Sequence, residues 1–388
     1  LIDRQLRVRS IRIAGLDAVE LTVIDERGER RQVPLSELVA IVPTPATPAA
    51  LTGVGTVVGV TQPDADALTR RITAGDAGFV LTVDGQRLIG QPGSASADSD
   101  SITWVHPAFG PVRIELERLL TLAMPNAGAL ALTLERDAAE DVLTLINGDR
   151  LRGLVASLGD PVVVETEAGA RFEVERATVA GATLANPPEP RAGAVAWLSD
   201  GTVIRVAAAS SAAGDIVDLA LESGAESAYA IGDLRALGLD AECLLPLSDL
   251  TPEAQVGPIE RRTVPPISYL HHPDDLAAGA NPTLGALDIR FPGPMRVDWR
   301  LPRRALRIAA TAALAKDAAP WGDCEIVVSV DGQERFRDHL ESGRPVIAIN
   351  EEILGGEVLT ISIEPGAYGP INDRVILHRP LILLDAPR

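Results

Sequence analysis

The first 240 residues alternate short apolar runs with polar turns, and this pattern predicts a succession of short β-strands. Gly, Asp or Asn separate the runs about every 8–12 residues, a spacing typical of all-β domains. The clearest runs lie at residues 18–24, 78–83, 141–146, 161–165 and 201–207. Asn147-Gly148 supplies the positive φ angles of a tight hairpin turn, so a hairpin is expected around it.

The same pattern recurs along the chain as an internal repeat. Residues 79–90, 141–153 and 195–206 resemble one another, and their turn glycines lie 63 and then 53 residues apart. A second shared segment follows each of these hairpins, at residues 113–119, 171–177 and 228–234. A further copy of it, at residues 32–38, has no recognisable hairpin before it. The sequence therefore predicts four units, the first of which lacks its opening strand.

Each unit is expected to contain a hairpin, one or two further strands, a 3₁₀-like turn and a closing strand. Five such strands fit a small SH3-like or Sm-like barrel, whose closure removes exposed edges. The alternative is one continuous sandwich or solenoid, because repeats of this length can also stack. The expected boundaries are a partial repeat at 1–43, a linker with a short irregular segment at 44–76, and repeats at 77–126, 139–187 and 193–242.

The pattern of apolar runs changes at residue 247. Residues 247–388 are expected to form one jelly-roll-like β-sandwich with a short lead-in segment. Apolar runs recur at residues 287–291, 295–301, 305–312, 324–330, 345–350, 358–364 and 374–384. Seven or eight strands over this length fit a single sandwich. The expected fold class is therefore all-β, with tandem small barrels followed by a sandwich.

Charge and composition narrow the range of partners. The net charge of −19 repels phosphate backbones, so nucleic acid is not expected as a partner. No run approaches the roughly 18 apolar residues of a membrane span. Cys243 and Cys324 fit either one disulfide or two buried thiols. The chain begins at Leu1, which we interpret as a processed or trimmed terminus, so a lost signal peptide stays open.

The C-terminal block resembles the NPCBM family of carbohydrate-binding modules. The resemblance rests on residues 324–336, with their Asp331-Gly332 turn, on three later segments and on the lead-in at 247–252. The three later segments are residues 343–349, 358–364 and 371–377. Two positions depart from the family pattern, the segment 285–290 and Leu377, where a tryptophan is usual. The resemblance implies a secreted bacterial protein outside the cytoplasm, with a sugar-binding sandwich of the kind attached to glycoside hydrolases.

Candidate ligand-binding residues follow from ring chemistry, because a flat aromatic ring can stack on the C–H face of a sugar. Trp321 and Tyr368 stand in Pro- and Gly-containing segments where exposed loops are expected, whereas Trp299 alternates with core positions and is expected to be buried. The proposed ligand-binding set is Trp321, Tyr368, Asp373 and His378.

A cluster of arginines suggests a second surface. Arg296 and Arg300 are expected on one strand face with Asp298 between them, and Arg303 and Arg304 follow closely. These four arginines are candidates for binding an acidic protein surface. The alternative is a solvated strand face with local ion pairs of little energetic value.

No catalytic, metal or cofactor motif is evident. The dinucleotide, phosphate-loop, zinc-protease and serine-hydrolase patterns are missing, and His271-His272-Pro273-Asp274-Asp275 is interpreted as a polar turn instead of a metal site. We therefore expect a non-catalytic extracytoplasmic binding or scaffold protein, whose partner is a carbohydrate or a cell-surface protein. The alternatives are a structural subunit of a homo-oligomeric cell-surface or filament assembly, and an accessory region of a glycoside hydrolase.

Overall fold

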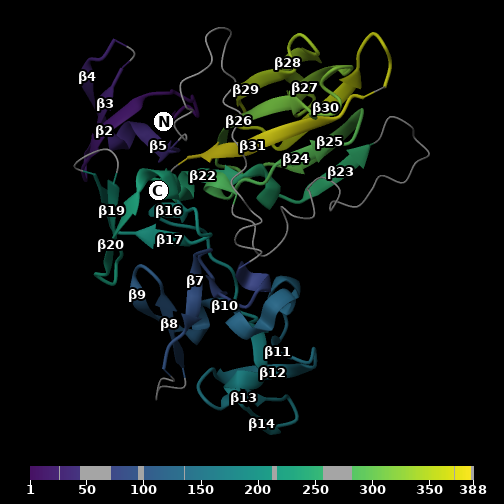
Figure 1. The fold of residues 1–388 in the computed structure, drawn as a ribbon. Coiled ribbons are helices and arrows are strands. Elements are labelled where there is room, and N and C mark those ends of the chain that lie inside the picture. The colour runs from purple at the N-terminus through teal and green to yellow at the C-terminus, as the bar shows by residue number, and fades with distance from the viewer. Residues whose placement is uncertain are drawn as a thin grey trace.

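The chain is built almost entirely from antiparallel strands, which confirms the expected all-β class (Figure 1). The computed structural model describes residues 1–25, 27–43, 71–94, 100–134, 136–211, 216–256, 282–370 and 372–385. Most of the expected linker and the segment around His271 lie outside these residues. No helix in the described part of the chain is long and apolar enough to cross a membrane.

Four sets of strands, which we call units 1 to 4, each end in a 3₁₀ turn and a closing strand. Unit 1 comprises β1 (Ile2–Asp3), β2 (Arg12–Leu16), β3 (Glu20–Ile24), β4 (Arg30–Pro34), η1 (Leu35–Glu37) and β5 (Leu38–Ile41). Unit 2 comprises β6 (Gly78–Thr82), β7 (Arg87–Pro92), β8 (Ser101–His106), β9 (Gly110–Glu115), η2 (Leu116–Arg118) and β10 (Leu119–Ala123). A longer 3₁₀ segment, η3 (Pro125–Thr133), follows unit 2.

Units 3 and 4 repeat this order. Unit 3 comprises β11 (Asp141–Leu145), β12 (Arg150–Ser157), β13 (Val162–Glu165), β14 (Arg171–Val174), η4 (Arg176–Thr178) and β15 (Val179–Thr183). Unit 4 comprises β16 (Ala194–Leu198), β17 (Val203–Val206), β18 (Ala208–Ser210), β19 (Ile216–Ala220), β20 (Glu226–Ala230), η5 (Ile231–Asp233) and β21 (Leu234–Gly238). In every unit the closing strand pairs with the opening strand. The strand pairings of the described residues leave the sheets open, so the comparison with a closed SH3-like barrel stays a prediction.

Unit 1 contains the hairpin that the sequence did not reveal, so the prediction that it lacks its opening strand is wrong. The backbone N–H of Arg4 donates to Glu37 O, as Val83 donates to Arg118 O in unit 2. Ile146 and Ser199 make the equivalent bonds in units 3 and 4. The residue that closes the turn has positive φ in all four units: Leu6 (54°), Gly85 (74°), Gly148 (90°) and Gly201 (97°). Leucine hides the turn in the sequence because this conformation strongly favours glycine.

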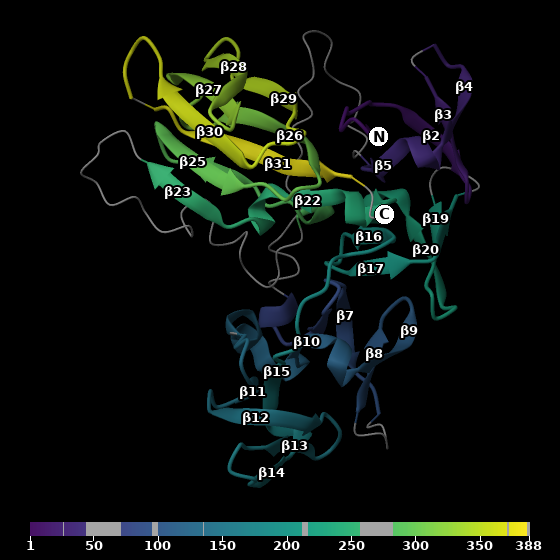
Figure 2. The ribbon, with the colours of Figure 1, turned by 180° about the vertical axis from the view of Figure 1, so that it is seen from behind.

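The units share one sheet, but their spatial order is 1-4-2-3 (Figures 1 and 2). Closing strands join unit 1 to unit 4 through β5 and β21, and unit 2 to unit 3 through β10 and β15. The second strands of units 4 and 2 meet where Val203 pairs with Arg87. The sheet is continuous, but a solenoid places successive repeats side by side, whereas unit 1 here adjoins unit 4.

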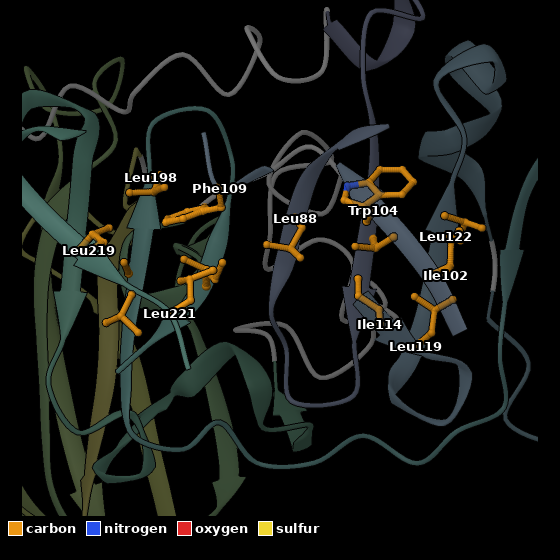
Figure 3. Close-up of a cluster of buried hydrophobic side chains, with 14 of the residues drawn as sticks. Leu88, Ile102, Trp104, Phe109, Ile114, Leu119, Leu122, Leu198, Leu219 and Leu221 are labelled. Carbon is orange, nitrogen blue, oxygen red and sulfur yellow. The ribbon is translucent and has the colours of Figure 1, made fainter. Parts of the chain in front are cut away.

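Unit 2 inserts a side chain into the core of unit 4. Phe109, at the turn between β8 and β9, is buried beside Leu198, Leu219 and Leu221 (Figure 3). Its ring also lies 5.7 Å from that of Tyr229, measured between centroids. The apolar interior of unit 4 is therefore completed by another unit, which couples the two energetically.

The C-terminal part forms a sandwich of two five-stranded sheets. One sheet has the order β22 (Leu244–Pro246), β31 (Val375–Leu384), β26 (Ala305–Leu314), β29 (Val346–Glu352), and β24 (Ile289–Phe291) also pairs with β31. The other has the order β23 (Pro252–Val256), β25 (Met295–Arg300), β30 (Val358–Pro365), β27 (Asp323–Val330), β28 (Gln333–Glu341). Both sheets contribute to one core, which includes Trp299 as expected. The sequence did not predict β28.

The sandwich packs against units 1 and 4. Leu6, Trp197, Leu284 and Leu383 belong to one buried cluster that spans all three parts. Asn350 of the sandwich also donates its side-chain N–H to Gln5 O, at 3.1 Å. The unit 1 hairpin therefore rests on the sandwich.

Both cysteines are buried free thiols. Of the two possibilities that the sequence left open, one disulfide or two buried thiols, the second is therefore correct. Burial raises the pKa of Cys243 to about 11 and that of Cys324 to about 12. Thiolates are the reactive form, so both side chains are expected to be inert at neutral pH.

Candidate functional site

Two loops at one end of the sandwich carry the exposed aromatic residues. The loop from β26 to β27 and the loop from β30 to β31 both cross between the two sheets. They cross at the same end, because Leu314 pairs with Val375 and Cys324 pairs with Pro365. The strand order therefore brings residues 315–322 and 366–374 together although about 50 residues separate them.

Hydrogen bonds and an ion pair hold the two loops to each other. Ala315 N–H donates to Arg374 O at 2.8 Å, and Gly366 N–H donates to Asp323 O at 2.8 Å. Arg374 also forms an ion pair with Asp317 at 2.8 Å. These contacts fix the loops as one surface.

Trp321 and Tyr368 present their rings to solvent on this surface. Their exposed fractions are 75% and 79%, the largest among the large hydrophobic residues of the described chain. Trp321 lies in a helical turn in which its N–H donates to Ala318 O, at 2.9 Å. The N–H of Tyr368 lies 3.3 Å from Asp323 Oδ2. Exposed rings on well-anchored backbone lose little freedom on binding, which suits a recognition surface.

Asp323 is a buried residue that binds the backbone of the loop from β30 to β31. The sequence did not indicate this role. Its side chain is buried, and its Oδ1 lies 2.7 Å from Nε2 of His339 on β28. Gly366 packs directly against Asp323, where a Cβ would lie 2.3 Å from its carbonyl oxygen. No sequence pattern indicates this arrangement, because β28 was not predicted and His339 had no assigned neighbour.

Asp373 belongs to the same loops but not to their surface. It is 1% exposed, and no side chain of the described residues donates a hydrogen bond to its carboxylate. Burial raises the pKa of Asp373, the backbone N–H of Asp323 opposes this shift in part, and the nearby Asp323 carboxylate adds to it. Asp373 therefore supports the loops from inside and does not reach a ligand at the surface.

His378 lies apart from the exposed rings. Its Nδ1 is 2.7 Å from Asp288 Oδ2, and the strand residues Val375–Leu377 separate it from the loop. Three strand residues span about 10 Å. Of the four predicted ligand-binding residues, Trp321 and Tyr368 are exposed on the two joined loops and Asp373 is buried in one of them, whereas His378 lies outside the loops.

The arginine cluster is largely engaged within the chain. Arg296 binds Asp298 through two hydrogen bonds of 2.9 and 3.0 Å, which confirms that these residues share a strand face. Arg300 pairs with Glu253 at 2.6 Å, Arg304 donates to Asp385 O, and Arg303 is exposed. Intrachain pairing favours the alternative of a solvated face over a basic docking patch.

The described residues contain no cluster of three or more His, Cys, Asp and Glu side chains that could hold a metal ion. His271, His272, Asp274 and Asp275 lie outside the described residues.

Comparisons with known proteins give partial structural similarity only. No family model and no curated protein matches the sequence. The resemblance to NPCBM modules therefore stays a prediction.

The most similar solved structures include CBM51 carbohydrate-binding modules. The CBM51-2 and INT domains of Clostridium perfringens ZmpB, in complex with GlcNAc, are 11% identical over 43% of this chain, with a TM-score of 0.29. This chain covers 36% of that one. The CBM51 of C. perfringens GH95, in complex with methyl-galactose, is 10% identical over 36% of this chain and 99% of its own, with a TM-score of 0.28.

The tandem CBM51 modules of the family 98 glycoside hydrolase from Streptococcus pneumoniae SP3-BS71 are 10% identical. They align with 79% of this chain and 88% of their own, with a TM-score of 0.29. Similarity at this level assigns no ligand to the present chain, so the site rests on its own geometry.

The buried Asp373 leads to a prediction about stability and pH. Its raised pKa means that the folded state holds the proton more tightly than the unfolded state, so stability falls as pH rises from about 3.8 through the folded pKa. Asp373→Asn removes the buried charge, and we expect it to raise the melting temperature at pH 7 by about 2–4 °C, or roughly 1 kcal/mol. Thermal unfolding at pH 7 and pH 4 measures this gain, which should shrink at the lower pH.

The matched control is Glu352→Gln at the end of β29, since Glu352 is an exposed carboxylate of the same sandwich outside the two loops. Its pH dependence should follow that of the wild type. An Asp373→Asn variant that melts at or below the wild-type temperature at pH 7 would show that the carboxylate is stabilised in the folded state.

Proposed function

We propose that the chain is a non-catalytic, extracytoplasmic binding protein whose sandwich recognises carbohydrate through the two joined loops. The observation that carries this proposal is the pair of exposed rings, Trp321 and Tyr368, on two loops that hydrogen bonds and an ion pair hold to each other. Rings that face solvent on an anchored surface offer stacking area for a sugar at low entropic cost. As an accessory region of a glycoside hydrolase, such a module would keep an enzyme near its substrate.

Fluorescence offers a direct test, because the four tryptophans differ sharply in exposure. Trp104, Trp197 and Trp299 are buried, so collisional quenching by iodide reports mainly on Trp321. We expect a bound sugar to protect Trp321 from quenching. GlcNAc and methyl-galactoside are the first probes, since the two neighbouring modules are solved with these sugars.

Substitution of either ring should weaken binding. We expect Trp321→Ala and Tyr368→Ala each to lower the affinity about tenfold or more, equal to about 1.4 kcal/mol, as measured by calorimetric titration. Phe172→Ala is the matched control, because Phe172 is a partly exposed ring in unit 3. Sugar binding that is unchanged by both loop variants would place the site elsewhere.

A further inference from the structure

A buried histidine holds the turn through which unit 2 enters the core of unit 4. His106 is the last residue of β8 and is 1% exposed, and its ring lies 5.0 Å from that of Phe109, measured between centroids. Its Nδ1 accepts from the backbone N–H groups of Ala108 and Phe109, at 3.1 and 3.2 Å. On the other side of the ring, Nε2 lies 2.9 Å from Oγ1 of Thr202 in unit 4. The imidazole therefore contacts both units at the point where the Phe109 ring is inserted.

These hydrogen bonds determine where the ring carries its proton. A ring nitrogen accepts a hydrogen bond only when it is unprotonated, so Nδ1 carries no proton and Nε2 donates its own to Thr202. A second proton can enter only at Nδ1, where it would point at two N–H donors. The N–H groups of Ala108 and Phe109 would then lose their acceptor inside the protein. The charged ring and this turn therefore exclude each other.

The charged and titratable groups around the ring act in opposite directions. From the β16–β17 turn, Asp200 Oδ2 lies 3.8 Å from Nε2 of His106 and favours a charged ring. The same carboxylate also faces Arg87 on β7 and Tyr229 on β20, and burial raises the pKa of Tyr229 so that its hydroxyl stays neutral. Burial of the imidazole outweighs Asp200 and lowers the pKa of His106. The neutral ring is thus the form that fits the folded chain.

The corresponding turns of units 1 and 3 use a side-chain oxygen as the acceptor. Asp25 Oδ1 accepts from the N–H groups of Arg27 and Glu29, at 2.9 and 3.0 Å. Thr166 Oγ1 accepts from the N–H of Ala170, at 3.2 Å. A hydroxyl does not titrate here and a carboxylate takes up a proton at about pH 4, whereas an imidazole titrates between about pH 5 and 8. Unit 2 therefore has the titrating acceptor in the turn that enters another unit.

We propose that His106 makes the insertion of Phe109 depend on pH: the neutral ring holds the turn in unit 4, and protonation at mildly acidic pH releases it. The released state takes up the proton more readily than the inserted state, so the insertion is strongest above the ordinary pKa of about 6.5 and weakens as pH falls below it. Release opens the apolar interior of unit 4 around Leu219 and Leu221 and loosens its contact with unit 2. The proposed sugar-binding loops lie outside this contact, so the two proposals are independent.

Hydrogen exchange of the full chain, followed by mass spectrometry at pH 7 and pH 5, tests the proposal. With rates corrected for the intrinsic effect of pH on exchange, we expect protection to fall at pH 5 in peptides that cover residues 106–110 and β19. A released histidine with an ordinary pKa is about 97% protonated at pH 5, which limits the fall to about 25-fold. Peptides from β13 in unit 3 should keep their protection and serve as the internal control.

His106→Asn separates the titration from the turn itself. Asparagine Oδ1 takes the place of Nδ1 as an acceptor for the N–H groups two and three residues later, as in an Asx turn, and does not titrate. We expect this variant to show the same protection at both pH values. His378→Asn is the matched control, because His378 pairs with Asp288 in the sandwich, and it should lose protection at pH 5 as the wild type does.

The ¹⁵N chemical shifts of the His106 ring in the wild type provide a readout that needs no variant. We expect Nδ1 to be unprotonated and Nε2 protonated at pH 7, with titration below pH 6.5. The proposal is overturned by a protonated Nδ1 at pH 7 or by wild-type protection that is equal at the two pH values. A His106→Asn variant that loses as much protection as the wild type would also overturn it, since another group would then be responsible.

Discussion

Phe109→Ala is expected to destabilise units 2 and 4 together, by about 3–5 kcal/mol. Phe109 belongs to unit 2 in the sequence, but its ring fills the core of unit 4 beside Leu219, Leu221 and Tyr229 (Figure 3). Truncation leaves a cavity in unit 4 and removes apolar contact between the units. Nearby, Nε2 of the buried His106 lies 2.9 Å from Thr202 Oγ1, so loss of the ring also loosens a polar contact.

Urea unfolding followed by tryptophan emission measures this effect, because Trp104 lies in unit 2 and Trp197 in unit 4. The urea concentration at the midpoint of unfolding should be markedly lower for Phe109→Ala than for the wild type, in both units. The control Phe172→Ala removes a ring that is 43% exposed, and it should cost less than about 1 kcal/mol. Equal midpoints for the two variants would mean that unit 4 is stable without the inserted ring.

The second large effect is expected at Leu6, where burial and backbone strain oppose each other. Leu6 is 3% exposed between unit 1 and the sandwich, and its φ of 54° is unfavourable for leucine. Leu6→Ala should destabilise the chain by about 2–5 kcal/mol, because it removes the buried side chain and keeps the strained backbone.

Leu6→Gly distinguishes the two contributions. Glycine removes the same contacts but adopts positive φ without strain, so we expect it to be about 1 kcal/mol more stable than Leu6→Ala. Urea unfolding of both variants measures the difference, with Val8→Ala as an exposed control in the same hairpin. A glycine variant less stable than the alanine variant would show that no strain is stored at this turn.

The strand content and the repeated plan could be predicted because they depend on local patterns. Alternating apolar runs and the glycines at positions 85, 148 and 201 determine the hairpins of units 2, 3 and 4. The same reasoning failed for unit 1, where Leu6 holds the glycine conformation through burial against a distant part of the chain. The spatial order of the units was also beyond prediction, since it depends on contacts such as that of Phe109 with unit 4.

The candidate site was predicted in part for a similar reason. Loop composition correctly indicated exposure of Trp321 and Tyr368. It could not indicate that Asp373 turns inward or that His378 pairs with Asp288, because both depend on strand register. The roles of Asp323 and His339 arise only when β27 and β28 are paired.

A glycan-array screen of the full chain, beside Trp321→Ala and the control Phe172→Ala, is the sharpest test of sugar recognition by the two joined loops. We expect the wild type and Phe172→Ala to bind the same set of glycans and Trp321→Ala to lose it. A blank array for the wild type, or an unchanged pattern for Trp321→Ala, would contradict sugar recognition by the two joined loops.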